Sequence, residues 1–266
     1  MLSVLMFPFL MVPVRSLMTR SQLMMRKPVA SSHAIMTYTK NQQSYIDALN
    51  DQNVALVVVI GSAGTGKTFM GCQWGMNRFL DGSSGGGANI NIKRIVITRP
   101  LVPVSGEEVG FLPGGMVSKM QPWTRPIYDA FLENNLVNKK MLDKYIVDED
   151  IEIIPLAFMR GRTFTDCFIF ADEMQNSTPE QMLMLMTRVG NGSKLVVSGD
   201  LAQSDIVSGG ENGLANFLEK YRKWIGGGGD DCGDRKMIRV VEFEKADIRR
   251  SKITSVVLDL YDNTPL

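Results

Sequence analysis

Short apolar runs alternate with amphipathic stretches along most of the chain. The run at 55–60 is unbroken and rich in β-branched residues, which is typical of a parallel strand buried on both faces. Other strand candidates lie at 94–98, 151–154, 167–171, 194–198 and 238–242. Between 42 and 49 the apolar residues recur at helical spacing, behind Thr39 or Asn41 as the helix cap. This alternation predicts an α/β fold, three-layer and doubly wound, with a mostly parallel sheet.

Residues 1–36 depart from this pattern. They hold seven of the 18 methionines, and the first acidic residue of the chain is Asp47. Four interpretations stay open: an organelle transit peptide, the apolar core of a signal peptide, a start codon misassigned upstream of Met18 or Met36, and a disordered tail. We expect the fold to occupy 37–266 as one domain.

The composition narrows the classes of function. With 44% hydrophobic and 21% charged residues the chain is globular, and no run approaches the roughly 18 uncharged apolar residues of a membrane span, so we expect no membrane partner. The net charge of +1 excludes bulk electrostatic coating of nucleic acid, which leaves only a local patch for such binding. Three cysteines without a C-x-x-C and a single histidine, His33, argue against disulfide and zinc frameworks. We expect a reducing compartment: the cytoplasm, or an organelle matrix if residues 1–36 are a transit peptide.

The P-loop pattern G-x-x-x-x-G-K-[ST] is matched by Gly61-Ser62-Ala63-Gly64-Thr65-Gly66-Lys67-Thr68. The match follows the strand at 55–60 and precedes a helical stretch, which is the context of a phosphate-binding loop. Its glycines let successive N–H groups point into one concavity around the phosphates. Lys67 is expected to reach the β and γ oxygens, and Thr68 to offer its hydroxyl to Mg²⁺. The loop and the adjoining Phe69 are the predicted nucleotide-binding residues; the alternative is a plain Gly-rich turn.

A second strand ends in two carboxylates. The apolar strand at 167–171 runs into Asp172 and Glu173, which is the form expected of a Walker B element. Asp172 is the predicted holder of the Mg²⁺ shell, and Glu173 the predicted general base that polarises the attacking water. The alternative is a strand end with a solvated acidic pair.

Two further residues are candidates for the same chemistry. Gln203 follows the strand at 194–198, and the carboxyl ends of strands line the ligand crevice of an open α/β sheet, so Gln203 is a candidate sensor of the γ-phosphate. Arg250 is a candidate arginine finger, which neutralises charge in the transition state. The alternatives are an ordinary turn for Gln203 and a solvated cationic pair for Arg249 and Arg250.

These motifs resemble the PhoH family of P-loop ATPases, over a stretch from about Gln42 to Leu258. The strings that carry the resemblance lie at 98–100, 106–107, 110–114, 119–120, 125–130, 155–163, 172–176, 199–203 and 247–251. The resemblance implies a RecA-like P-loop NTPase core, with 37–266 as a PhoH-like P-loop ATPase domain. It also implies that Gln42 reads adenine, so the expected cofactors are ATP and Mg²⁺. Met174 departs from the alanine that is usual after the acidic pair.

An oligomer is expected because only one RecA-like lobe fits the chain. The second surface around the nucleotide must then come from a neighbouring subunit, with Arg250 reaching that subunit's ATP, and the resemblance to hexameric members favours a homo-oligomeric ring. Such a ring would hold single-stranded RNA or DNA by phosphate contacts from Arg99, Arg125, Arg160 and Arg162. The alternative for Arg99 and Arg162 is pairing with Glu107 or other acids that shape the nucleotide site.

Two functions from different classes stay open. The first is an ATP-hydrolysing remodeller of RNA or another single-stranded nucleic acid. The second is a nucleotide-dependent regulatory or binding module with weak hydrolysis, which the family resemblance links to the phosphate-stress response. A small-molecule kinase is disfavoured, because it needs an acceptor-binding lid and leaves Gln203 and Arg250 without a role.

Overall fold

The computed structural model describes residues 38–83, 90, 92–100, 125–133, 136–205, 211–227 and 233–248. All of them belong to the unit Ile35–Leu266, whereas the unit Met1–Ala34 lies outside the described residues. Arg250 and the rest of 249–266 also lie outside them. The interpretations of residues 1–36, the domain boundary at 37 and the arginine finger therefore stay predictions.

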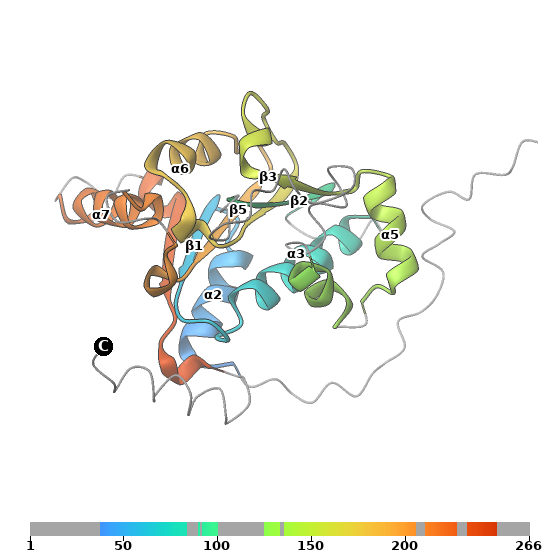
Figure 1. The fold of residues 1–266 in the computed structure, drawn as a ribbon, viewed down its shortest axis with the longest axis horizontal. Helices are drawn as coiled ribbons and strands as arrows, with labels where there is room; N and C mark the ends of the chain where they lie inside the picture. Colours follow the sequence, from blue (N-terminus) through green and yellow to red (C-terminus); the bar gives the residue numbers. More distant parts are fainter. Residues whose placement is uncertain are drawn as a thin grey trace, which may run out of the picture. The chain divides into compact units, whose positions relative to one another are not determined.

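A parallel sheet forms the centre of the described unit, with the strand order β3-β2-β4-β5-β1-β6 (Figure 1). Every pairing between these strands is parallel. The strands are β1 (Leu56–Ile60), β2 (Arg94–Arg99), β3 (Ile151–Pro155), β4 (Cys167–Ala171), β5 (Lys194–Gly199) and β6 (Ile238–Glu242). Each of them overlaps a strand predicted from the sequence, and the α/β fold class is confirmed.

Helices cover both faces of the sheet, as Figure 1 shows for α2, α3 and α5 on one side and α6 and α7 on the other. The first apolar core joins one face to α2 (Lys40–Asn50), α3 (Lys67–Ser83), a helix at 125–132 and α5 (Lys139–Val147). The second joins the other face to α6 (Pro179–Met186) and α7 (Gly213–Gly226). This arrangement confirms the three-layer, doubly wound P-loop NTPase fold. In the part of the chain that the structure describes, no helix is long and apolar enough to cross a bilayer.

Short 3₁₀ turns carry the chain past the strand ends. They are η2 (Leu156–Met159), η3 (Met174–Asn176), η4 (Leu201–Gln203), η5 (Gly233–Met237) and η6 (Lys245–Asp247). The turns η3 and η4 directly follow β4 and β5. They bend the chain away from the sheet at the carboxyl ends of these strands, where the acidic pair and Gln203 lie.

Helix α2 begins at a capping box. The Thr39 hydroxyl accepts a bond from the Gln42 N–H (3.2 Å), and the Thr39 N–H donates to Gln42 Oε1 (3.1 Å). Thr39, one of the two predicted caps, is therefore the residue that caps this helix. Tyr45 and Leu49 then point into the first core at 0% exposure.

Helix α3 lies unusually close to β4. A Cβ atom added at Gly75 would come within 2.3 Å of the Phe168 ring, so only glycine permits this approach. The same holds for Gly71, near the start of α3, where a Cβ atom would lie 2.4 Å from the ring of Phe170, near the end of β4. This close packing brings the P-loop to the acidic pair.

A buried lysine ties β5 to the end of α2. Lys194 is 2% exposed, and its Nζ donates to the carbonyl oxygens of Ala48 (3.2 Å) and Asp51 (2.8 Å). These carbonyls lie at the C-terminal end of α2, where a cation also interacts favourably with the negative end of the helix dipole. Burial nevertheless lowers the pKa of Lys194 to about 8, because it disfavours the charged ammonium.

We predict a pH-dependent stability difference between the wild type and Lys194→Met. Between pH 8 and 10.5 the unfolded chain holds a proton on Lys194 that the folded chain releases, so the wild type gains stability relative to the variant as the pH rises, by about 2–3 kcal/mol. Urea unfolding of both proteins from pH 7.5 to 10 measures this, and other groups that titrate in this range cancel in the difference. If the difference in unfolding free energy between the two proteins does not change with pH, the pKa of Lys194 is not lowered in the folded state.

Candidate functional site

The P-loop begins where β1 ends, at the side of the sheet formed by the carboxyl ends of the strands, and leads directly into α3. The Gly61 N–H donates to the Gly199 carbonyl (3.2 Å), which joins the start of the loop to the end of β5. Gly61 has a φ of 151°, and a Cβ atom there would lie 2.7 Å from the Phe243 Cβ. Both features require glycine at the first position of the predicted P-loop.

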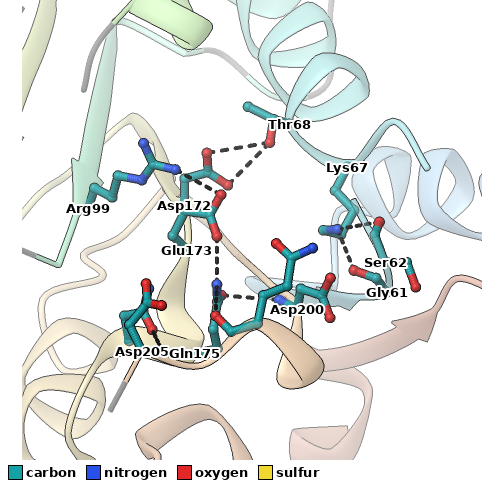
Figure 2. A network of polar contacts seen from close by, with 12 residues as sticks. Gly61, Ser62, Lys67, Thr68, Arg99, Asp172, Glu173, Gln175, Asp200 and Asp205 are labelled. Atoms are coloured by element: carbon teal, nitrogen blue, oxygen red, sulfur yellow. Dashed lines mark hydrogen bonds and ion pairs between the residues drawn. The ribbon is translucent and has the colours of Figure 1, made fainter. Parts of the chain in front are cut away.

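Side chains within the loop hold it in shape. Lys67 Nζ donates to the carbonyl oxygens of Gly61 and Ser62, the second at 2.9 Å (Figure 2). Thr65 is fully buried, and its hydroxyl donates to the Ser62 carbonyl (2.8 Å). The lysine therefore lies in the concavity of the loop, where a phosphate-binding ammonium is needed.

The Thr68 hydroxyl meets the Asp172 carboxylate across the site, at 3.2 Å to Oδ1 and 3.4 Å to Oδ2 (Figure 2). Asp172 is only 5% exposed, and this burial raises the pKa of its carboxyl. The charge of Glu173 also raises that pKa, while Arg99 and the Thr68 hydroxyl oppose the rise. The ionised form of Asp172 is therefore poorly stabilised by the protein alone.

These residues fit a bound Mg²⁺, because it prefers oxygen ligands and compensates a buried negative charge. Thr68 and Asp172 provide such oxygens side by side. Ser198 is buried and lines the same cavity, and its hydroxyl also acts to lower the pKa of Asp172, so it lies close to that carboxylate. A third side-chain oxygen is therefore present beside the two that would hold the metal.

Glu173 lies just beyond Asp172 with its backbone in the left-handed region (φ 54°, ψ 37°). This conformation is uncommon for residues with a side chain, and it turns the carboxylate back toward the strand ends. An Arg99 Nη2 to Glu173 Oε1 contact of 2.8 Å forms an ion pair at the end of β2 (Figure 2).

The arginines predicted to contact nucleic acid have different surroundings. Arg99 lines the nucleotide site and pairs with Glu173; Arg162 pairs with Glu152 at 2.8 Å and stacks on a phenylalanine ring. Arg99 thus pairs with an acid of the nucleotide site, as the alternative expected. Arg162 also pairs with an acid, but neither Arg162 nor Glu152 lines that site, and Glu107 lies outside the described residues. Arg125 and Arg160 are exposed.

A cavity of about 550 Å³ opens between the P-loop and the strand ends. The predicted residues that line it are Ala63, Gly64, Gly66, Lys67, Thr68, Phe69, Asp172, Glu173 and Gln203. Its opposite wall comes from the segment 125–133 and includes Asp129 and Glu133, which sequence reasoning missed. Asp129 belongs to the string at 125–130 that resembles the family, but nothing in that string assigned it to the site, because only the packing of the segment brings Asp129 and Glu133 to the cavity.

Gln175 is a second residue that sequence reasoning missed. Its side-chain Nε2 donates to Glu173 Oε2 (2.6 Å), and its Oε1 accepts from the Asp200 N–H (3.1 Å). Two signals were available: its place two residues after Glu173, and its membership of the string at 172–176 that resembles the family. Its contact with Asp200, beyond β5, could not be read from a local pattern.

Gln42, the predicted adenine contact, lies against the P-loop. Its Nε2 donates to the carbonyl oxygens of Thr65 and Asp247, both at 3.1 Å. Its side chain thus joins the loop to the segment that precedes Arg250. Its contact with a base stays a prediction.

A model of the family described as PhoH-like protein matches residues 34–262, most of the chain. The chain belongs to the PhoH-like protein family. A PhoH-like protein of Bacillus subtilis is 35% identical over 88% of this chain and 66% of its own length. Protein PhoH of Escherichia coli K12 is 30% identical over 85% of this chain and 58% of its own.

This PhoH-like chain thus spans about 58 to 66% of the length of these two relatives. Among solved structures, the Pif1 helicase from Candida albicans is similar over 86% of this chain and 44% of its own, at 14% identity. The TM-score of that match is 0.41, which is too low to carry an argument about function. The PhoH-like family and the described P-loop, strand order and helix layers identify a P-loop NTPase.

We predict that Asp172→Asn stabilises this PhoH-like protein in the absence of nucleotide and metal. Asparagine keeps an oxygen for the Thr68 hydroxyl but removes the buried charge. The folded state holds the Asp172 proton more tightly than the unfolded state, so the ionised group weakens folding increasingly as the pH rises above the usual carboxyl range.

At pH 7.5 in EDTA, the melting temperature of Asp172→Asn should exceed that of the wild type by roughly 2–4 °C, which is about 1 kcal/mol for a domain of this size. The gain should shrink at pH 4. Asp148→Asn, which changes an exposed aspartate, is the matched control. A lower melting temperature for Asp172→Asn at pH 7.5 would show that the carboxylate charge is satisfied within the protein.

Proposed function

We propose that this PhoH-like protein is a Mg²⁺-dependent ATPase that acts on single-stranded nucleic acid, with RNA as the preferred substrate. One observation supports the ATPase assignment above all: the Thr68 hydroxyl at the start of the P-loop helix meets the buried Asp172 carboxylate at the end of β4. This is the pair of oxygens between which a P-loop enzyme holds the metal of its nucleotide.

The residues divide the work by position. Backbone N–H groups of 61–68 and the Lys67 ammonium bind the phosphates, and Thr68 and Asp172 hold Mg²⁺. Bound Mg²⁺ would neutralise part of the negative charge of the triphosphate. Glu173 orients the attacking water and accepts its proton as the terminal phosphate bond breaks.

Residues beyond the P-loop complete the proposed site. Gln203 follows β5 and lines the same cavity, where it is suited to sense the γ-phosphate. Gln42 adjoins the P-loop and is the candidate for adenine selection. Arg250 is the candidate arginine finger of a neighbouring subunit in a homo-oligomer.

The nucleic-acid substrate is supported by the element after β5. The sequence Gly199-Asp200 with Gln203 resembles the corresponding element of helicase-like motors. Of the four candidate arginines, the exposed Arg125 and Arg160 are the better phosphate contacts, because Arg99 and Arg162 already pair with carboxylates.

We predict that ATP turnover requires Mg²⁺ and rises several-fold with single-stranded RNA. Lys67→Ala and Glu173→Gln should each lower the stimulated rate by at least about 100-fold, because one removes phosphate binding and the other the base. Lys223→Ala and Glu219→Gln, from an exposed ion pair on α7, are matched controls that should keep the wild-type rate.

The predicted stimulation is measured as phosphate release in three separate assays: with single-stranded RNA, with single-stranded DNA and without nucleic acid. A turnover that is equal in all three would contradict the remodelling function and favour the nucleotide-dependent regulatory module. Wild-type rates in Glu173→Gln would contradict its role as the base.

We predict an oligomer in which sites are shared between subunits. Lys67→Ala and Arg250→Ala should each be inactive alone, yet mixtures should recover part of the activity, because mixed assemblies contain some sites with both residues intact. Phosphate release as a function of mixing ratio measures this. Light scattering that shows a monomer both without nucleotide and with ATP and Mg²⁺ would exclude the shared site.

A further inference from the structure

The Glu173 carboxylate is held at both of its oxygens. Oε1 lies 2.8 Å from Arg99 Nη2, and Oε2 accepts a 2.6 Å bond from Gln175 Nε2 (Figure 2). The two partners come from different places, one from the end of β2 and the other from η3. Together they fix the plane of a carboxylate whose backbone is already turned into the left-handed region.

Gln175 faces a second group as well as Glu173. Its side chain belongs to a residue that is 1% exposed, and its Oε1 accepts from the Asp200 N–H at 3.1 Å. Its Nε2 also donates to the Gln203 carbonyl at 3.3 Å. One neutral amide thus connects the end of β4 with the turn η4 that carries Gln203.

The chemistry of this position calls for an amide. It must donate to a carboxylate on one side and accept from a backbone N–H on the other, which neither a carboxylate nor an aliphatic side chain does. Burial raises the penalty for any of these groups left unpaired. Arg99 supplies charge to Glu173, whereas Gln175 supplies direction without changing the net charge.

We propose that Gln175 is a positioning residue that aligns Glu173 for its reaction and ties this alignment to the turn that carries Gln203. The proposal rests on the proposed role of Glu173 as the base. A shift of η4 is transmitted to the Glu173 carboxylate through a single side chain. The base and the γ-phosphate sensor then take up their working positions together.

The first test uses Gln175→Leu, which is similar in size but has no hydrogen-bonding group. It should lower kcat for ATP about 10- to 100-fold, because a misplacement of about 1 Å at a reacting group has an effect of this order. The Kd for ATP should change less than about threefold, since the P-loop is untouched. In the Glu173→Gln background the same substitution should cause no further loss of kcat.

The second test uses Gln175→Glu, which places a second carboxylate against Glu173. Two carboxylates at this distance compete for one proton, so the acid limb of the kcat–pH profile should move to higher pH. If Gln175 had only a structural role, kcat would fall by the same factor at every pH, and the acid limb would stay at the same pH. Ser204→Ala is the control, because among the described residues the Ser204 hydroxyl donates to the backbone carbonyl of Gln175 (3.1 Å) and accepts from Asn212, and does not contact the Gln175 side chain.

The third test needs no turnover. Urea unfolding of Gln175→Leu, Glu173→Ala and the double variant, without nucleotide or metal, forms a double-mutant cycle. The two effects should be non-additive, because each substitution removes the same hydrogen bond. Ser204→Ala and Glu173→Ala should instead be additive.

The outcomes separate this inference from the proposed function. Additive unfolding effects, together with an unmoved pH profile in Gln175→Glu, would overturn the inference even if the wild type hydrolyses ATP. Absence of turnover in the folded wild type would overturn the proposed function and, with it, the assignment of Glu173 as the group that is aligned.

Discussion

The parallel pairing of β1 with β5, and of β5 with β4, places the carboxyl ends of these three strands side by side. Ile60 and Gly199 are partners in the register, and the Gly61 N–H continues the pairing by donating to the Gly199 carbonyl. The phosphate-binding loop, the acidic pair and the sensor turn therefore become neighbours although they lie far apart in sequence. Antiparallel pairing of these strands would place the same residues at opposite edges.

The charges at this edge give the site its chemical character. Among the described residues that line the cavity, the carboxylates of Asp129, Glu133, Asp172, Glu173 and Asp200 outnumber the cations of Lys67 and Arg99. A polyanionic triphosphate enters such a cavity favourably only with a divalent cation between it and the acids. The burial of Asp172 has the same implication, because its ionised form is disfavoured in the protein alone. In the protein without a cation, the ionised Asp172 carboxylate therefore opposes folding at the position where the proposed metal would bind.

Local sequence patterns predicted most of the fold and many of the residues that line the cavity. The strands β1 and β4 were visible because they are buried along their whole length and appear as unbroken apolar runs. The P-loop was visible because its glycines and Lys67 all lie within the short stretch 61–68. The contacts between distant residues were not predictable. Arg99 was expected either at nucleic acid or paired with an acid of the nucleotide site, and its actual partner, Glu173, was not named in advance. The proposed role of Gln175 depends on a turn that follows another strand. Such roles depend on packing, which no local pattern records.

The proposed ATPase function requires that the P-loop bind a triphosphate and that Thr68 and Asp172 hold its metal. Calorimetric titration of ATP into the folded, nucleotide-free protein, once with Mg²⁺ and once with EDTA, measures this binding. We predict saturable binding at one site per chain with Mg²⁺ and clearly weaker binding in EDTA. No detectable binding of ATP or ADP by the folded protein in the presence of Mg²⁺ would rule out a nucleotide site at the P-loop.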